Sequence, residues 1–535
     1  MNAPQAPFFV SPHRDESEGV DYLGLRATNL SMMGTLLPGI NNVVMMVRPF
    51  SVMAWIAWKY EQTVLTTKSV ASLSSFRKFQ EKVETLFVWS HVQEGSPASL
   101  PGNQQGDVGK PVLDFQFKPF SRTASLLDAA LYGPSMKTLN GLGFLFSADG
   151  FFKPTDAGCA LAKGLDASLL TNLTSAQYEF VSSLTDTKAK RMDLTGVMPG
   201  WDVDDASAAE REAFAQRLYH PQEIGEPHVH ANRSTMLHLV LEHLREAGEP
   251  MQVDEMRQRL AAMPLPAAVA VHAEVDVFRN ARHYWQVLQV RQAQRLGLEA
   301  LFGWVERCLI EDNATSVSEL LDLTLKAMER DGDGMAFDNG YIGSRLAFYA
   351  HDGADADALF AAGLTDDSLN IFKAIEDLEA VTGNTTTATP MALRAIELLV
   401  QCTAYAEAFK HDAFAAQHIN DGPKFRVPLG YWAEAVRHHQ SLPLRTFLRK
   451  VIETFLISQH LGIAASRAGD ERSRMRISIE DRGLTSLLPG APKVFRPGRT
   501  PDRLGAAMAL MHSCGLIQAN TPARHSAAGG PLYRP

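Results

Sequence analysis

The sequence predicts a mainly α-helical protein of several domains, with winged-helix-like modules that contain short β-hairpins. Three observations predict this fold class. Apolar residues recur at three- and four-residue spacing, which places them on one face of a helix. Helix-capping signals precede several of these stretches. Three helical segments also run into short apolar stretches bounded by turn residues, as a helix followed by a β-hairpin does.

The chain is long enough for several domains. Its 535 residues exceed the size at which one hydrophobic core usually stops growing, so we expect about two to four domains. A stretch rich in Gly, Pro, Ser and Gln at 93–111 is typical of a linker. The predicted segments are an N-terminal helical region at 1–92, a winged-helix-like module at 112–200, a central helical domain at 201–382, a helical domain at 390–488 and a basic winged-helix-like module at 489–535.

Composition excludes several classes of protein. With 45% hydrophobic and 21% charged residues, the chain falls in the globular rather than the disordered or membrane range. The charge-free stretch at 27–47 holds too many Asn, Gly and Pro residues to span a bilayer, so we interpret it as a buried helix–turn–helix. The four cysteines are far apart, which disfavours disulfides and zinc knuckles, and no secretory signal is visible. We therefore expect a cytoplasmic protein with no membrane partner.

Several helices are predicted from their spacing and caps. The aromatic segment at 48–60 fits a buried helix better than a platform for stacking bases. Residues 298–309 carry apolar side chains at helical spacing, and Ser316 with Glu319 forms a capping box at the start of the next helix. Thr389 and Pro390 then predict the start of an amphipathic helix over 391–410.

Three segments have the helix-and-hairpin pattern. In the first, at 126–165, Asp149 and Gly150 separate two apolar runs between helical stretches. In the second, at 232–263, a helix ends at Gly248 and a short strand precedes another helix. In the third, at 500–535, Thr500 caps a helix and two short strands pair across a Gly-rich tip.

Positive charge gathers at the carboxy-terminal end. Residues 437–535 hold fifteen Lys/Arg and six Asp/Glu, a net charge of +9, while the whole chain carries -9. Beside the third segment, this charge predicts contact with the DNA backbone. Salt bridges to the acidic remainder of the chain are the alternative. The predicted nucleic-acid-binding residues are Arg474, Arg476, Arg496, Arg499, Arg503 and Arg524.

Two segments suggest metal chemistry as an alternative. His220, His228 and His230 lie near Glu223, and an H-x-H pair with a carboxylate can hold zinc. The 107–118 segment has a carboxylate, a glutamine and a lysine at spacings seen in metal-dependent nucleases. Neither pattern is complete, because no second H-x-H, HExxH or cysteine pair accompanies the histidines. We therefore assign no metal, no cofactor and no catalytic residue.

The N-terminal sequence is similar to a group of proteins. Tyr22-Leu-Gly-Leu-Arg26, Leu37-Pro-Gly-Ile-Asn41 and Arg48-Pro-Phe-Ser51, followed by Trp55 and Trp58, resemble uncharacterised bacterial proteins found near phage-defence and mobile-element genes. The similarity covers about the first sixty residues. It implies a defence context and carries over no site residue.

These observations favour a non-catalytic subunit of a bacterial multi-component system of the antiviral-defence kind. Its expected partners are protein subunits of the same system and double-stranded DNA. Two alternatives stay open: a metal-dependent nuclease or hydrolase that uses the His220–His230 cluster or the 107–118 segment, and a pure protein scaffold.

Overall fold

The computed structural model is mainly helical, with β-strands confined to two-stranded sheets. Its chain forms two compact units that each combine distant segments. Unit 1 comprises 1–32, 258–264 and 282–500, and unit 2 comprises 33–257, 265–281 and 501–535. The predicted segment 489–535 thus contributes to both units. The structure describes residues 21–68, 70–95, 100, 112–114, 126, 131–148, 150–185, 188–190, 196–332, 335, 337, 339–383, 391–466, 475–487, 495, 497–520 and 531–535.

In its described residues, unit 1 is a helical body with one small hairpin. The bounds of α1, α9 and α11 include residues of both units. The elements that contribute to unit 1 are α1 (Arg26–Leu36), α9 (Val253–Ala262), α11 (Val275–Glu311), α12 (Val317–Asp331), α13 (Tyr341–Ala350), η4 (His351–Gly353), α14 (Ala356–Thr365), α15 (Ile371–Gly383), α16 (Met391–Ala408), η5 (Phe409–His411), α17 (Ala413–His418), η6 (Lys424–Arg426), α18 (Leu429–His439), α19 (Leu444–Lys450), the π-helix η7 (Val451–Ser458), α20 (Gln459–Ser466), and the hairpin β5 (Ile477–Glu480) and β6 (Gly483–Ser486).

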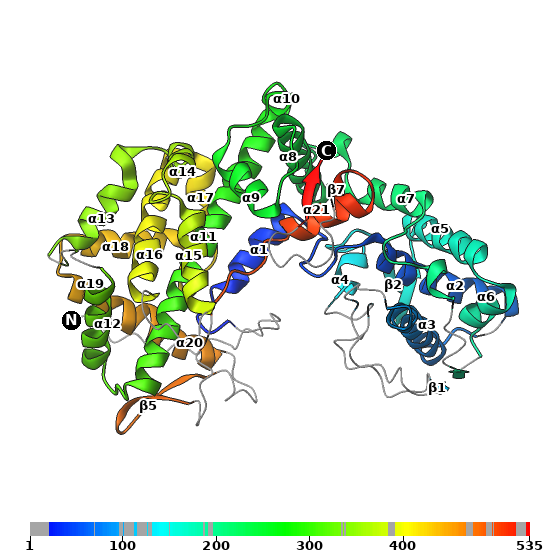
Figure 1. Cartoon of the computed structure of the whole chain (residues 1–535), viewed down its shortest axis with the longest axis horizontal. Helices are drawn as coiled ribbons and strands as arrows, with labels where there is room; N and C mark the ends of the chain where they lie inside the picture. The colour runs from blue at the N-terminus through cyan, green and yellow to red at the C-terminus, as the bar shows by residue number, and fades with distance from the viewer. Residues whose placement is uncertain are drawn as a thin grey trace, which may run out of the picture. The chain divides into compact units, whose positions relative to one another are not determined.

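The core of unit 1 forms around α16. This helix is buried on nearly all sides and packs against α12, α13, α15 and α18 (Figure 1). Its backbone approaches α11 closely at Gly297, where a Cβ atom would lie 2.7 Å from the Cγ of Leu399. On the α18 side, Trp432 Nε1 donates to the carbonyl oxygen of Leu399 at 3.0 Å. A helix buried on all sides carries its apolar residues all round, which agrees with the composition of α16.

Helix α11 is also buried, yet it carries many polar side chains. Gln286, Arg295, Glu299 and Glu306 are each less than 10% exposed. A polar group away from water needs a partner. Arg295 accordingly pairs with Glu299 at 2.9 Å and donates to the Thr500 hydroxyl. Glu306 forms an ion pair with Arg476. The apolar face predicted at 298–309 is confirmed, but the opposite face is internal as well.

In its described residues, unit 2 holds the remaining helices and three strand pairs. Its elements, besides parts of α1, α9 and α11, are α2 (Val47–Thr67), α3 (Leu73–Gln93), β1 (Val112–Asp114), α4 (Gly133–Met136), β2 (Leu145–Ala148), β3 (Phe151–Pro154), α5 (Asp156–Asn172), α6 (Ser175–Ser182), β4 (Lys188–Lys190), η2 (Met198–Gly200), α7 (Ala208–Leu218), η3 (Pro221–Glu223), α8 (Val229–Ala247), α10 (Ala267–Ala270), α21 (Leu504–Ser513), β7 (Gln518–Asn520) and β8 (Leu532–Arg534).

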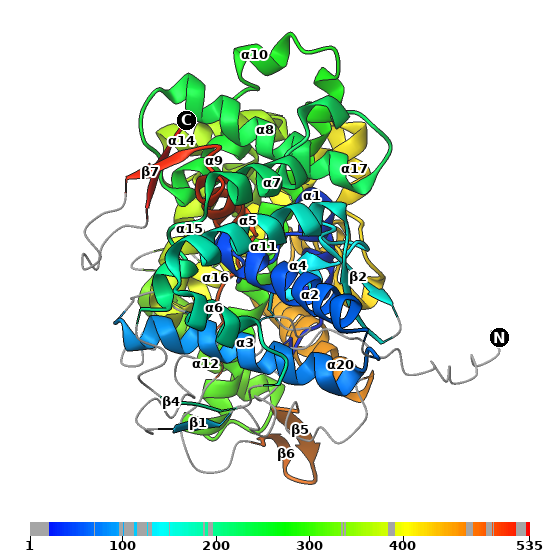
Figure 2. The ribbon, with the colours of Figure 1, turned by 90° about the vertical axis from the view of Figure 1, so that its right-hand side faces the viewer.

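The core of unit 2 centres on α2, which packs against α5 and α7 (Figure 2). Its first half is buried, with Trp55 fully enclosed, so the predicted core helix at 48–60 is confirmed. Arg48 is 1% exposed and lies 3.4 Å from the carboxylate of Glu210, which is fully buried. Arg48 also donates to the carbonyl oxygens of Gly200 and Asp205. The guanidinium therefore ties α2, η2 and α7 together.

Most of the helices and turns that local sequence signals predict are present in the structure. β2 and β3 pair antiparallel, and Gly150 in their turn has a φ of 85°, which suits glycine. Ser316 and Glu319 form the predicted capping box of α12. The helix predicted at 391–410 is present as α16, which is buried except at Arg394, Glu397 and Glu407. Of the predicted helical stretch after Leu126, the described residues form only the short α4.

Other sequence-based expectations concern the membrane and the thiols. Within the described residues, no helix combines the length and apolar character that crossing a bilayer requires. All four cysteines are free thiols, which confirms that none is in a disulfide.

Close packing at Gly297 gives a testable prediction. We expect Gly297→Ala to destabilise the protein by about 1–3 kcal/mol, because the added methyl group overpacks the contact with Leu399. Gly462→Ala in α20 is the matched control, since nothing lies within 4 Å of the added atom. That change should stabilise the helix by about 0.5–1 kcal/mol. Urea unfolding of both variants measures the change in the free energy of unfolding relative to wild type. Changes of the same sign in the two variants would contradict this account of the α11–α16 contact.

Candidate functional site

Arg476, one of the predicted nucleic-acid contacts, is engaged inside unit 1. Its Nε and Nη2 atoms donate to both carboxylate oxygens of Glu306, at 2.5 and 2.8 Å, and its Nη1 donates to the Tyr22 hydroxyl at 3.0 Å. Burial disfavours the charged form, but the hydrogen bonds and charge of Glu306 outweigh it, so the pKa of Arg476 lies above its ordinary value. This two-pronged pair has the geometry of a strong arginine–carboxylate contact. For this residue, the predicted salt-bridge alternative is the one observed.

Arg499 and Arg503 also have internal partners. Arg499 Nε lies 3.0 Å from a carboxylate oxygen of Glu379, and the Arg499 backbone N–H donates to the other oxygen. Arg503 donates to the carbonyl oxygen of Leu37, and burial lowers its pKa to about 10. The guanidinium groups of both arginines are therefore occupied by other parts of the fold.

The three other predicted contacts, Arg474, Arg496 and Arg524, lie outside the described residues. Contact with DNA at the basic end remains a prediction, and it now depends on these three side chains.

The second and third helix-and-hairpin segments of the sequence are joined by a β-bridge between Met251 and Tyr533. β8 pairs antiparallel with β7, and on its other side Tyr533 forms a bridge with Met251. The Met251 N–H donates to the Tyr533 carbonyl oxygen at 2.7 Å, and the reverse bond measures 2.8 Å. We use the name "split module" for α8, the residues from 248 to 257 that follow it into the first turns of α9, and residues 501–520 and 531–535. Residues 521–530 lie outside the described part of the chain.

An ion pair joins the two halves of the split module. Arg257 on α9 donates to both carboxylate oxygens of Asp502, at 2.5 and 3.2 Å, and Asp502 is 3% exposed. Burial works against the charge, but Asp502 outweighs it and raises the pKa of Arg257. The predicted cap of the following helix is wrong. The helix begins at Leu504 rather than after Thr500, and the Thr500 hydroxyl accepts a hydrogen bond from Arg295.

Helix α21, which follows this ion pair, faces inward. Its apolar side chains from Ala506 to Met511 are largely buried, and the helix contains no lysine or arginine. Its last residue, Ser513, accepts a hydrogen bond from the Val47 backbone N–H at 2.9 Å. The exposed charged residues of the split module are Arg245, Glu246, Glu249, Asp254, Glu255 and Arg534. Among its described residues, exposed carboxylates therefore outnumber exposed guanidinium groups.

The histidine cluster does not assemble as a metal site. His228 lies 3.6 Å from Glu223, but the rings of His228 and His230 are 6.1 Å apart. Burial, together with the neighbouring Arg233 and Arg217, lowers the pKa of His230 to about 4. Across the described residues, no group of three or more His, Cys, Asp or Glu side chains is placed to hold a metal ion. In the other predicted metal segment, β1 pairs with β4, while residues 107–111 and 115–118 are outside the description.

Comparison with known proteins adds no relative: no family model, no curated protein and no solved structure matches the chain.

The ion pair that closes the split module predicts a stability effect. We expect Asp502→Asn to destabilise the protein by about 3 kcal/mol, the lower end for a broken buried pair, because Asp254 still contacts Arg257. Asp276→Asn removes an exposed arginine–aspartate pair of the same unit and should cost no more than about 1 kcal/mol. Chemical denaturation of the full chain compares the two. Equal losses would show that the Arg257–Asp502 pair does not join the halves of the module.

Proposed function

We propose that the chain is a cytoplasmic, non-catalytic assembly subunit of a bacterial multi-component system, which docks a basic surface of a partner protein through its split module. The order of elements in the split module supports a winged-helix interpretation. Helix α8, the extended Met251 and helix α9 come first, and helix α21 with the hairpin β7–β8 completes the set. In winged-helix proteins the helix before the hairpin is the one that enters the DNA major groove.

The observation that carries the proposal is the burial of α21. A recognition helix reads DNA with exposed polar side chains, and here that helix is apolar and faces inward. Winged-helix folds do not determine function by themselves, so the surface that remains exposed decides the ligand. This argument favours protein docking over base recognition by the split module.

Charge supports the same choice. Glu249, Asp254 and Glu255 are exposed on the split module, where exposed carboxylates outnumber exposed arginines among the described residues, and an excess of negative charge repels phosphate groups. A partner surface rich in lysine or arginine is attracted by it, which speeds and orients association. The defence context of the proposed system comes from the resemblance of the N-terminal sixty residues. Double-stranded DNA stays a proposed second partner through the basic carboxy-terminal end, and a pure scaffold differs from this proposal only in lacking the DNA contact.

The DNA part of the proposal predicts a shallow salt dependence. If three arginines each neutralise one phosphate, the affinity for duplex DNA should fall about 40-fold between roughly 50 and 200 mM salt. Fluorescence anisotropy of the full chain measures this. A triple variant with alanine at 474, 496 and 524 should lose the binding, while alanine at the exposed Arg245, Arg279 and Arg330 should preserve it. No detectable binding at low salt removes DNA from the proposal.

The docking part predicts a charge-dependent partner. In pull-downs from the native host, the tagged wild-type chain should capture a protein that Glu249→Lys/Asp254→Lys captures at least about tenfold less, because the substitution reverses the attracting charge. Glu179→Lys/Glu212→Lys changes the same amount of charge at exposed sites outside the split module and should capture as much as wild type. Equal capture by all three proteins would exclude docking through the acidic surface.

A further inference from the structure

Unit 2 carries an exposed surface that the proposed docking function does not use. A short turn joins α2 to α3, and residues 65–68 and 70–74 at this end of the two helices are all exposed (Figure 2). Three aliphatic side chains are among them: Leu65, Val70 and Leu73 are 66%, 92% and 38% exposed. Single apolar residues are common on protein surfaces, whereas a group of three at one turn indicates an interaction site.

Basic side chains accompany these aliphatic ones. Lys68 lies in the turn itself, and Arg77 and Lys78 lie near the start of α3, where both are exposed. Arg77 is four residues after Leu73, so the two side chains share one face of the helix. Between 62 and 80 the sequence holds these three basic residues and no aspartate or glutamate. We use the name "α2–α3 tip" for Leu65, Lys68, Val70, Leu73, Arg77 and Lys78.

The turn of the α2–α3 tip is held in place by hydrogen bonds. The Ser72 backbone N–H donates to the buried Tyr60 hydroxyl at 2.9 Å, and this hydroxyl donates to the Ser72 carbonyl oxygen at 3.0 Å. Lys68 ends α2 in the left-handed conformation, with a φ of 51°, which glycine adopts more easily. A lysine where glycine fits better indicates that the charged side chain itself is used.

The charge around the α2–α3 tip is predominantly positive. Glu61 and Glu81, the acidic residues that flank it in the sequence, are only partly exposed. Behind the tip, Phe151 of β3 stacks on Phe76 of α3 with their ring centres 5.8 Å apart. Lys153 Nζ lies 5.8 Å from the ring centre of Phe151, which brings a fourth cation to the same region. An anionic partner would therefore be attracted.

We propose that the α2–α3 tip binds the surface of an anionic lipid bilayer. Its three aliphatic side chains enter the boundary between head groups and acyl chains, and its three basic side chains contact lipid phosphates. Nucleic acid fits less well, because single strands are held by aromatic stacking and none of the tip residues is aromatic. The expectation of no membrane partner concerned a segment that crosses the bilayer, and a surface contact requires none.

Sedimentation of the full chain with lipid vesicles tests this proposal. We expect at least about tenfold stronger partition onto phosphatidylcholine vesicles that contain about 30% phosphatidylserine than onto phosphatidylcholine alone, because each basic side chain near an anionic surface adds to the attraction. Added salt should weaken the binding, since it screens exposed charges. Equal partition onto the two kinds of vesicle, or no sedimentation with the anionic vesicles at low salt, would overturn the proposal.

Charge variants separate the α2–α3 tip from general attraction. Lys68→Gly/Lys78→Gln removes two charges and preserves the fold, because glycine suits the left-handed backbone at 68 and glutamine is a good helix former. It should weaken partition onto the anionic vesicles by at least about tenfold. Arg245→Gln/Arg279→Gln removes the same charge at exposed positions outside the tip and should partition as wild type does. Equal partition of the two double variants would show that the tip is not the binding site.

Aliphatic variants separate a bilayer from other anionic surfaces. Leu65→Ser/Val70→Ser removes two highly exposed apolar side chains and should weaken partition onto the anionic vesicles by at least about fivefold. Val229→Ser/Val271→Ser is the matched control, since these side chains are 51% and 85% exposed in the same unit, and it should partition as wild type does. No loss with the first variant would exclude insertion and leave an acidic protein as the partner of the tip.

Discussion

Buried polar side chains on α11 are the constraint on which unit 1 depends. A charge or an amide removed from water destabilises a fold unless another group satisfies it. On α11 the partners come from distant parts of the chain: Glu306 holds Arg476, Arg295 holds Thr500 and Gln286 holds Asp357. These partners lie between 71 and 205 residues away in sequence. Satisfying one helix thus selects which loops and helices gather around it.

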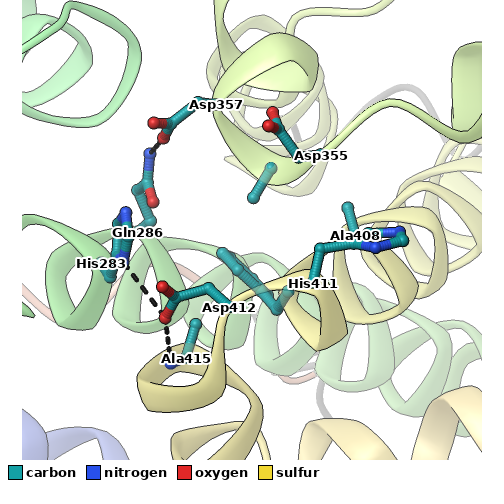
Figure 3. A pocket seen from close by; sticks show the side chains of 10 residues that line it. His283, Gln286, Asp355, Asp357, Ala408, His411, Asp412 and Ala415 are labelled. Carbon is teal, nitrogen blue, oxygen red and sulfur yellow. Dashed lines mark hydrogen bonds and ion pairs between the residues drawn. The ribbon is translucent and has the colours of Figure 1, made fainter.

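The same constraint explains the role of the basic carboxy-terminal end. A net charge of +9 over 437–535 suggests a surface for an anionic ligand when only the sequence is considered. In the fold, Arg476 and Arg499 neutralise the carboxylates of Glu306 and Glu379. Part of the positive charge is therefore the internal counter-charge of the acidic remainder. Gln286, on the same helix as Glu306, has partners for its nitrogen, one of which is Asp357 (Figure 3), but none among the described residues for its oxygen.

The proposed docking surface acts through charge more than through a preformed site. Exposed carboxylates outnumber exposed arginines among the described residues of the split module, and such an excess mainly steers association with a basic partner.

Sequence alone determined the local features of this protein. The capping box at Ser316, the buried aromatic helix at 48–60 and the β2–β3 hairpin all depend on residues within a few positions of one another, so their chemistry is legible in the chain. Tertiary structure decided the rest. That Met251 bridges Tyr533, that Arg476 meets Glu306 and that Gln286 meets Asp357 are long-range pairings, which periodicity and spacing do not encode. Such pairings are set by which buried groups must be satisfied once the helices pack, and that requirement exists only in the folded chain.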